Sequence, residues 1–166
     1  MCDLAAWRNP IFLTIVIYLD QTGGETESIR IHFRIGTSMP FHCTGTGKAM
    51  LAYLRENELE EILANHKLMA FTPNTITNKR KLREELKSIR AEGYAFNNCE
   101  YQSMVCVIGG AIFDSSNRVV GSVAVAALSN RLSLEMGPRV GAQVKKTAFN
   151  ISRELGCTVD VLEISR

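Results

Sequence analysis

The sequence predicts an α+β fold in which helices pack on an antiparallel sheet. The expected elements run in the order strands, helices, strands and a final long helix. Residues 104–114 and 118–128 form two long apolar stretches separated only by turn residues, which is typical of a β-hairpin. Connections this short favour antiparallel neighbours, because parallel strands need long crossovers.

The N-terminal third is predicted to contain two strands. Residues 1–10 resemble the end of a helix that Pro10 stops, and we expect them to be a peripheral tail. The apolar stretch 12–20 predicts a buried strand, and residues 21–27, with two adjacent glycines, predict a turn. Residues 28–35 alternate strictly between apolar and polar side chains, which predicts a half-exposed strand.

The middle of the chain is predicted to be helical, with helices over residues 45–54, 57–65 and 79–91. Asn57 is expected to cap the second of these, and Gly93 is expected to end the third. Residues 67–77 are predicted to be a loop. The third helix carries several basic side chains, but interspersed glutamates break the positive field, so we expect a solvated face instead of a DNA-binding one.

The C-terminal part is predicted to finish the sheet and cover it. Residues 94–101 are expected to form a short strand or extended connection before the hairpin. Apolar residues then recur at helical spacing between residues 135 and 155, and Gly156 follows, which predicts a long amphipathic helix with a glycine end. Residues 158–166 are expected to be a peripheral tail.

Length and composition favour one globular domain. The chain has 166 residues, a net charge of +2 and no apolar run long enough to span a membrane, so neither a nucleic-acid nor a membrane partner is indicated by charge or hydropathy. Its five cysteines include no C-x-x-C pair and no zinc-type spacing, which predicts buried thiols in a cytoplasmic protein without cofactor or metal. The alternative is a metal site built from His42, Cys43, Cys99 and Cys106.

Residues 36–54 form a loop rich in glycine, threonine and serine that leads into a helix near Gly45. The N–H groups at the start of a helix favour anionic groups, so we expect a small-molecule pocket with its floor at Gly45, Thr46 and Gly47. The stretch is not a nucleotide-binding P-loop, because His42 replaces the first required glycine and Ala49 follows Lys48. The alternative is purely architectural, with Thr44 acting as a helix N-cap.

The same stretch carries a family resemblance. Residues 39–52, M-P-F-H-C-T-G-T-G-K-A-M-L-A, resemble the signature of the C-terminal effector-binding domain of IclR-family transcriptional regulators. Residues 71–77, 82–94 and 112–121 agree with the family in the same order, so the resemblance covers nearly the whole chain. It implies a GAF-like or profilin-like sensor domain, which agrees with the α+β prediction.

The resemblance also implies where an effector would bind, between the glycine-rich loop and neighbouring strands. The positions that match the family's site are Met39, Gly45, Thr46, Gly47, Asn97, Val105, Val107, Ala124 and Ala126. The sequence supports this placement independently. Residues 105 and 107 differ by two, as do residues 124 and 126, so each pair lies on one face of its strand.

Several of these identities depart from the family pattern. Members that bind small oxo-acids have an aspartate where this chain has Asn97, a cysteine where it has Val107 and two serines where it has Ala124 and Ala126. Cys106 is adjacent to Val107 and is therefore expected on the opposite face. One reading is a pocket for an acid with an aromatic or longer aliphatic part. The other is a closed pocket in a structural dimerisation module.

No catalytic constellation emerges from the sequence. There is no G-x-S-x-G motif, and the adjacent residues His42 and Cys43 point in opposite directions on an extended chain, so a small thiol-dependent enzyme is only a minor alternative. We therefore expect residues 1–166 to be a single ligand-sensing domain of a bacterial transcription regulator. It would bind a small organic acid, form a dimer or tetramer, and contact DNA only through a winged helix-turn-helix domain absent from this chain.

Overall fold

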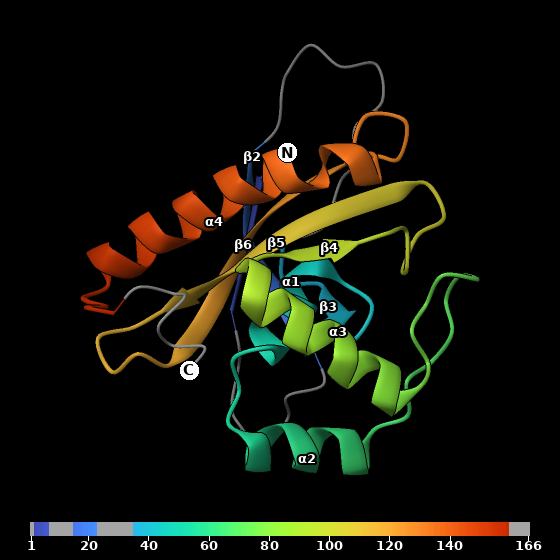
Figure 1. Ribbon diagram of the computed structural model, residues 1–166, viewed down its shortest axis with the longest axis horizontal. Helices are drawn as coiled ribbons and strands as arrows, with labels where there is room; N and C mark the ends of the chain where they lie inside the picture. Colours follow the sequence, from blue (N-terminus) through green and yellow to red (C-terminus); the bar gives the residue numbers. More distant parts are fainter. Residues whose placement is uncertain (1, 7–14, 23–34, 160–166) are drawn as a thin grey trace.

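The computed structural model describes residues 2–6, 15–22 and 35–159. Their strands form one antiparallel sheet in the order β3-β2-β1-β6-β5-β4. The strands are β1 (Cys2–Ala6), β2 (Ile15–Thr22), β3 (Ser38–Pro40), β4 (Ala95–Asn97), β5 (Val105–Phe113) and β6 (Val119–Leu128). Helices lie against the sheet, so the predicted α+β class is confirmed (Figure 1).

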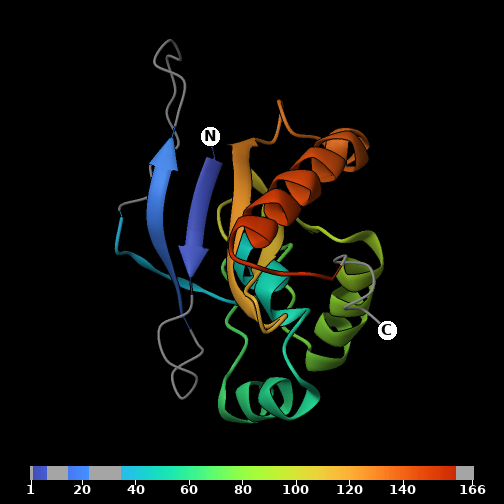
Figure 2. The same cartoon turned by 90° about the vertical axis from the view of Figure 1, so that its left-hand side faces the viewer.

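The N-terminal prediction was wrong. Residues 2–6 do not form a helix in a peripheral tail: they form β1 near the middle of the sheet, where Leu4 pairs with Asp20 of β2 and with Val123 of β6. Figure 2 shows β1 between these two neighbours. Five residues are too few for periodicity to distinguish helix from strand, and the two flanking strands decide the conformation.

The second predicted strand is confirmed from residue 15 and extends to Thr22. The predicted strand 28–35 lies outside the described residues except for its last residue, Ile35, which belongs to an exposed turn. Pro10 and the greater part of the predicted C-terminal tail also lie outside them.

The helical predictions are confirmed, with small shifts at the ends. The helices are α1 (Gly45–Leu51), α2 (Glu56–Asn65), α3 (Lys79–Glu92) and α4 (Gly137–Glu154), the last preceded by the 3-10 turn η2 (Leu134–Met136). The prediction that Asn57 caps this helix was wrong, because α2 begins at Glu56, one residue before the predicted start. Arg55 is the N-cap, and its backbone N–H donates to the Glu58 carboxylate at 3.0 Å, which leaves Asn57 inside the helix.

Left-handed glycines end the two longest helices, as the sequence predicts. Gly93 follows α3 with φ 83°, and Gly156 follows α4 with φ 85°. Residues with a Cβ rarely adopt this conformation, so glycine is the residue that lets the chain leave the helix here. At its other end, α3 is capped by the Asn78 side chain, which accepts from the N–H groups of Arg80 and Lys81.

The predicted hairpin of β5 and β6 is also confirmed. The Asp114 carboxylate accepts from the N–H groups of Ser116 and Arg118 and closes the turn. Asn117 adopts φ 58°, a left-handed conformation that asparagine tolerates better than other residues with a Cβ. The turn therefore fixes the register of the two longest strands, with Val107 opposite Ala126.

Two adjacent glycines in β5 show that the sheet is covered on both faces. A Cβ on Gly110 would lie 3.0 Å from the Ala148 Cβ of α4, and a Cβ on Gly109 would overlap the Gly45 carbonyl at the start of α1. Successive residues of a strand face opposite sides, so α4 and α1 lie on opposite faces. Figure 1 shows α4 on one side of the hairpin, with α1 and α3 on the other.

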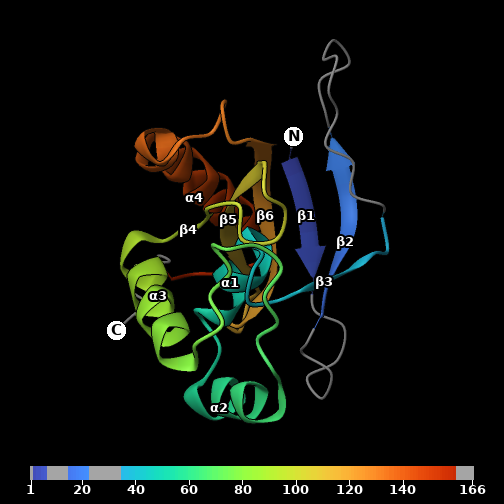
Figure 3. The same cartoon turned by 90° about the vertical axis from the view of Figure 1, so that its right-hand side faces the viewer.

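An apolar cluster joins the three helices that lie on the α1 side of the sheet. Leu51 of α1 packs there with residues of α2 and α3, including Leu63 and Leu82, which are 1% and 0% exposed. Helix α2 lies at the end of the molecule farthest from α4 in all three ribbon views, including Figure 3. The α1 side is therefore a layered helical region, while on the opposite face α4 is the only helix among the residues that the structure describes.

Candidate functional site

The loop before α1 is fixed by Thr44. Its Oγ1 accepts from the Gly47 N–H at 3.1 Å and donates to the Pro40 carbonyl at 2.9 Å. The N-cap role considered for Thr44 is thus confirmed, and the Gly47 N–H is engaged by the cap. Gly47 has a steric role as well, because a Cβ there would overlap the Phe41 carbonyl. The donors that this helix start could offer a ligand are therefore those of Gly45 and Thr46.

Most of the residues expected to bind an effector gather on the α1 face of the sheet. Met39, Val107, Ala124 and Ala126 form one buried cluster, with Tyr101 and Val105 packed against it. Gly45 lies directly against Val107, since a Cβ on the glycine would come within 2.9 Å of the valine side chain. Cys106 packs on the opposite face with Ile108 and Val144, as the alternation predicts.

A small cavity lies at this cluster. It is lined by Met39, Thr44, Asn97, Tyr101, Gln102, Val105 and Val107, of which four belong to the expected effector site. Its volume is about 10 Å³. That is no more than one water molecule needs, so in this conformation side chains of the domain fill the site.

Asn97 joins the cavity wall to the loop before α1. Its side-chain amide donates to the Cys43 carbonyl, and its Oδ1 accepts from the Glu100 N–H at 3.0 Å. The side chain is only 1% exposed. Asn97 therefore lines the cavity and also connects two backbone segments. The neutral amide suits this connection because it supplies both a donor and an acceptor.

Sequence reasoning missed a buried charge beside the site. Lys48 is 0% exposed, and its Nζ donates to Glu85 at 2.9 Å, Glu100 at 2.6 Å and the Phe96 carbonyl at 3.0 Å. Burial raises the pKa of Glu100, the Lys48 charge opposes that shift and the Glu85 charge adds to it. The one sequence signal was a lone charged residue in the apolar stretch 48–54.

The segment Thr72-Pro73-Asn74-Thr75 fixes the backbone of residues 98–100, which lies between the cavity residues Asn97 and Tyr101. Thr72 Oγ1 donates to the Cys99 carbonyl at 2.9 Å, Asn74 Nδ2 to the Asn98 carbonyl at 3.0 Å, and Thr75 Oγ1 to the Glu100 carbonyl at 2.6 Å. Three successive carbonyls are thereby satisfied by side chains. These contacts give a physical reason for this segment of the family resemblance: it orders the chain that carries Tyr101 and Gln102.

The thiol next to the loop is not activated. Cys43 is 0% exposed, and its pKa is raised to about 12, mainly by burial and further by the Glu100 charge. A nucleophilic cysteine needs the opposite shift. His42 Nε2 hydrogen-bonds the Met69 carbonyl at 2.9 Å, and burial lowers its pKa. Within the described residues, no group of three or more His, Cys, Asp or Glu side chains is placed to hold a metal ion.

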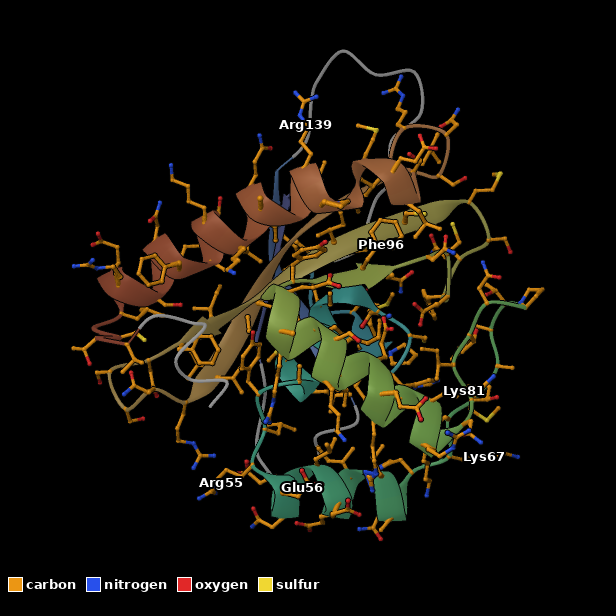
Figure 4. All side chains as sticks on the ribbon, in the orientation of Figure 1. Arg55, Glu56, Lys67, Lys81, Phe96 and Arg139 are labelled. Atoms are coloured by element: carbon orange, nitrogen blue, oxygen red, sulfur yellow. The ribbon has the colours of Figure 1, made fainter. Side chains whose placement is uncertain are left out.

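A larger hollow lies away from the expected effector residues. It has a volume of about 710 Å³, opens to solvent and is lined by Ala64, Asn65, His66, Lys67, Leu68, Met69, Ala70, Thr77 and Lys79. In Figure 4, Lys67 and Lys81 lie near this corner, between the end of α2 and the start of α3.

The basic face of α3 is partly neutralised, since Arg80 pairs with Glu84 and Arg83 with Glu60. Among the described helices, none is long and apolar enough to cross a bilayer.

Comparison with known proteins gives one consistent result. The family model described as "Bacterial transcriptional regulator IclR C-terminal" matches residues 13–153. The HTH-type transcriptional repressor AllR of Klebsiella pneumoniae is 32% identical over 128 residues, covering 77% of this chain and 47% of that protein. The HTH-type transcriptional regulator XynR of Escherichia coli K12 is 27% identical over 140 residues, covering 84% and 55%.

A solved structure agrees with these sequence relatives. The IclR protein of Thermotoga maritima superimposes with a TM-score of 0.85 at 34% identity, covering 93% of this chain and 61% of that one. The chain thus spans about half the length of the curated relatives it matches. These relatives are named as transcription regulators, not as enzymes. The chain belongs to the IclR family of transcriptional regulators and comprises the C-terminal effector-binding domain of that family.

Proposed function

We propose that this domain binds a small organic acid with an apolar or aromatic part and thereby controls transcription. DNA contact is assigned to a winged helix-turn-helix domain outside these residues, which fits the HTH-type names and the greater length of the relatives. The domain would act as a dimer or tetramer in the cytoplasm, and the effector would favour one arrangement of the paired DNA-binding domains.

The observation that carries the proposal is the makeup of the cavity wall. Val105 and Val107 line the cavity, and Ala124 and Ala126 belong to the same buried cluster, so the β5–β6 side offers methyl groups instead of hydroxyl or thiol groups. Thr44, Asn97 and Gln102 supply a few polar groups on the other sides. Pockets for small organic ligands combine mostly apolar walls with a few placed polar groups.

Binding would require the cavity to enlarge. Its volume of about 10 Å³ is far below the roughly 300 Å³ or more that a typical ligand pocket provides. Tyr101 is the natural gate, because it lies on the chain between β4 and β5 and contacts the ring of Phe71, which is 45% exposed. An effector that occupies only the opened state shifts the population towards it.

A thermal-shift panel tests the proposal. Glyoxylate and pyruvate would be compared with hydroxybenzoates and octanoate. A ligand at a hundred times its Kd stabilises the folded state by about 2.7 kcal/mol, which corresponds to a rise in Tm of several degrees for a domain of this size. We expect a rise with the aromatic or medium-chain acids alone. A rise with glyoxylate alone would contradict the assignment of an apolar wall.

Two matched variants test whether the ligand binds at the apolar cluster. Ala126→Leu fills the apolar cluster, whereas Ala127→Leu adds the same atoms to the opposite face of β6. We expect the first variant to lose the ligand-induced rise in Tm and the second to keep it, with circular dichroism confirming that both are folded. Ala124→Ser combined with Ala126→Ser should shift the preference towards smaller, more polar acids.

A second candidate is a structural dimerisation module with a closed pocket, which the small cavity volume favours. Leu134 and Met136, which are 63% and 41% exposed, lie together just before α4 and are candidates for part of an association surface. Sedimentation velocity across a concentration series would show assembly. Assembly without a thermal shift from any acid would favour this module over a sensor.

A further inference from the structure

Two cysteines meet behind the cavity wall. The Sγ atoms of Cys99 and Cys106 are 3.0 Å apart, and the two residues are 6% and 2% exposed. A disulfide has an S–S length of about 2.0 Å, so an approach of roughly 1 Å would bring them to bonding distance. Cys157, another buried cysteine, donates to Asn117 Oδ1 instead of contacting either of these thiols.

The backbone at Cys99 is unusual. Cys99 has φ 55°, a left-handed conformation that residues with a Cβ seldom adopt and that asparagine or glycine would adopt at lower cost. The conformation is held from outside, because the carbonyls of residues 98–100 all accept from side chains of residues 72–75. An uncommon conformation that the surroundings enforce is a reason to look for a role. Here it accompanies contact between the two thiols.

We propose that Cys99 and Cys106 are a redox-sensitive dithiol whose oxidation to a disulfide locks the segment that carries Tyr101 and Gln102. The cross-link would close residues 99–106 into a small ring. Tyr101 and Gln102 line the cavity and lie inside that ring. Oxidation of these thiols does not depend on which ligand the cavity binds.

The oxidant is a hydroperoxide. The sulfur of Cys99, the more exposed of the two, attacks one peroxide oxygen; the O–O bond breaks, and Cys99 becomes a sulfenic acid as hydroxide leaves and takes up the thiol proton to form water. The Cys106 sulfur then attacks the Cys99 sulfur and displaces a second water molecule. With hydrogen peroxide, two thiols and one peroxide give one disulfide and two waters, with two electrons passing from sulfur to oxygen.

The buried surroundings of the two thiols are expected to slow their oxidation. Burial, and then the contact with Cys99, raise the pKa of Cys106 to about 12, so its thiolate is scarce at neutral pH. Oxidation is therefore expected to be slow compared with that of an exposed thiol. This predicts a device that responds to sustained oxidation instead of brief exposure.

The test is peptide mapping of the native 166-residue chain after hours with millimolar hydrogen peroxide at pH 8, followed by alkylation of free thiols. No lysine or arginine lies between Arg90 and Arg118, so one tryptic peptide contains both cysteines. We expect this peptide to lose about 2 Da and to escape alkylation. Further cleavage after Glu100 should leave its two parts joined until dithiothreitol is added.

Matched variants complete the test. Cys99→Ser and Cys106→Ser should each abolish the loss of mass, and Cys157→Ser, another buried cysteine, should leave it unchanged. The oxidised chain should melt about 5 °C higher than the reduced chain, because the ring restricts the unfolded state. A cross-link that forms only in urea, or that joins other cysteines first, would overturn the proposal. So would cleavage at Tyr101 by chymotrypsin that is equally fast in both redox states.

Discussion

The two faces of the β5–β6 hairpin are built in contrasting ways. On the α4 face, Ile108 and Val123 pack with Val144 and Ala148 in an apolar layer. On the α1 face, the small cavity lies beside a fully buried lysine and its two glutamates. Neighbouring residues of the same strands supply both faces. The difference suggests that one face fixes the fold while the other keeps a polar frame around a site that can change.

The largest effect is expected from removing the buried cation. Lys48→Met should lower the free energy of unfolding by about 3–5 kcal/mol, because it leaves the buried Glu100 carboxylate unpaired. Val144→Ala, on the α4 face, should cost about 2 kcal/mol by leaving a small cavity. Urea denaturation of both variants measures the contrast.

The double variant Lys48→Met with Glu100→Gln is the control for the charge. It should recover a large part of the lost stability, because replacing a buried ion pair by neutral groups removes the uncompensated charge. If the double variant were as unstable as Lys48→Met, lost packing of the lysine chain would explain the effect, and the contrast between the faces would not be electrostatic.

The two adjacent glycines sharpen the comparison sterically. Gly109→Ala should cost about 1–3 kcal/mol, since its Cβ would meet the backbone of Gly45. Gly110→Ala should cost less than about 1 kcal/mol, because its Cβ would meet the Ala148 and Val144 side chains at 3.0–3.2 Å, where a small shift suffices. Equal Tm values for the two variants would show that α1 is not seated as closely as the structure indicates.

The smallest effect is a difference in pH dependence between two carboxylates. The raised pKa of Glu100 means that its contribution to stability is fully present below its unfolded-state pKa and is lost as pH rises through the folded-state pKa. Glu58 behaves oppositely. The Arg55 guanidinium, aided by Arg118, lowers its pKa to about 2, so its contribution is present above its unfolded-state pKa and is lost as pH falls towards 2.

Free energies of unfolding between pH 3 and pH 8 would test both signs. Glu100→Gln should remove a loss of stability on the alkaline side, and Glu58→Gln should remove a loss on the acidic side. Parallel curves for the two variants would mean that the buried Glu100 titrates like the more exposed Glu58, which would contradict the opposite pKa shifts.

Local patterns in the sequence were sufficient for the helices, their glycine ends and the β5–β6 hairpin. Period-two spacing was also sufficient to place Val105 with Val107, and Ala124 with Ala126, on one side of the sheet. The position of β1 was not predictable, because its pairing with Val123 joins distant parts of the chain. The ion pair of Lys48 with Glu100 was missed for a related reason, and Cys99 and Cys106 were considered only as metal ligands with His42 and Cys43. These contacts depend on partners that only the complete fold brings together.

The pairing of β1 with β6 also has a consequence for how the chain folds. β1 precedes β6 in the chain, and the two strands meet only after the more than one hundred residues between them have been synthesised. Such a long-range pairing is slow to form, because a large loop must close first. Until then β1 and β6 each present an unpaired edge, which invites pairing with other chains. Expression at lower temperature, or with chaperones that shield nascent strands, should therefore raise the soluble yield.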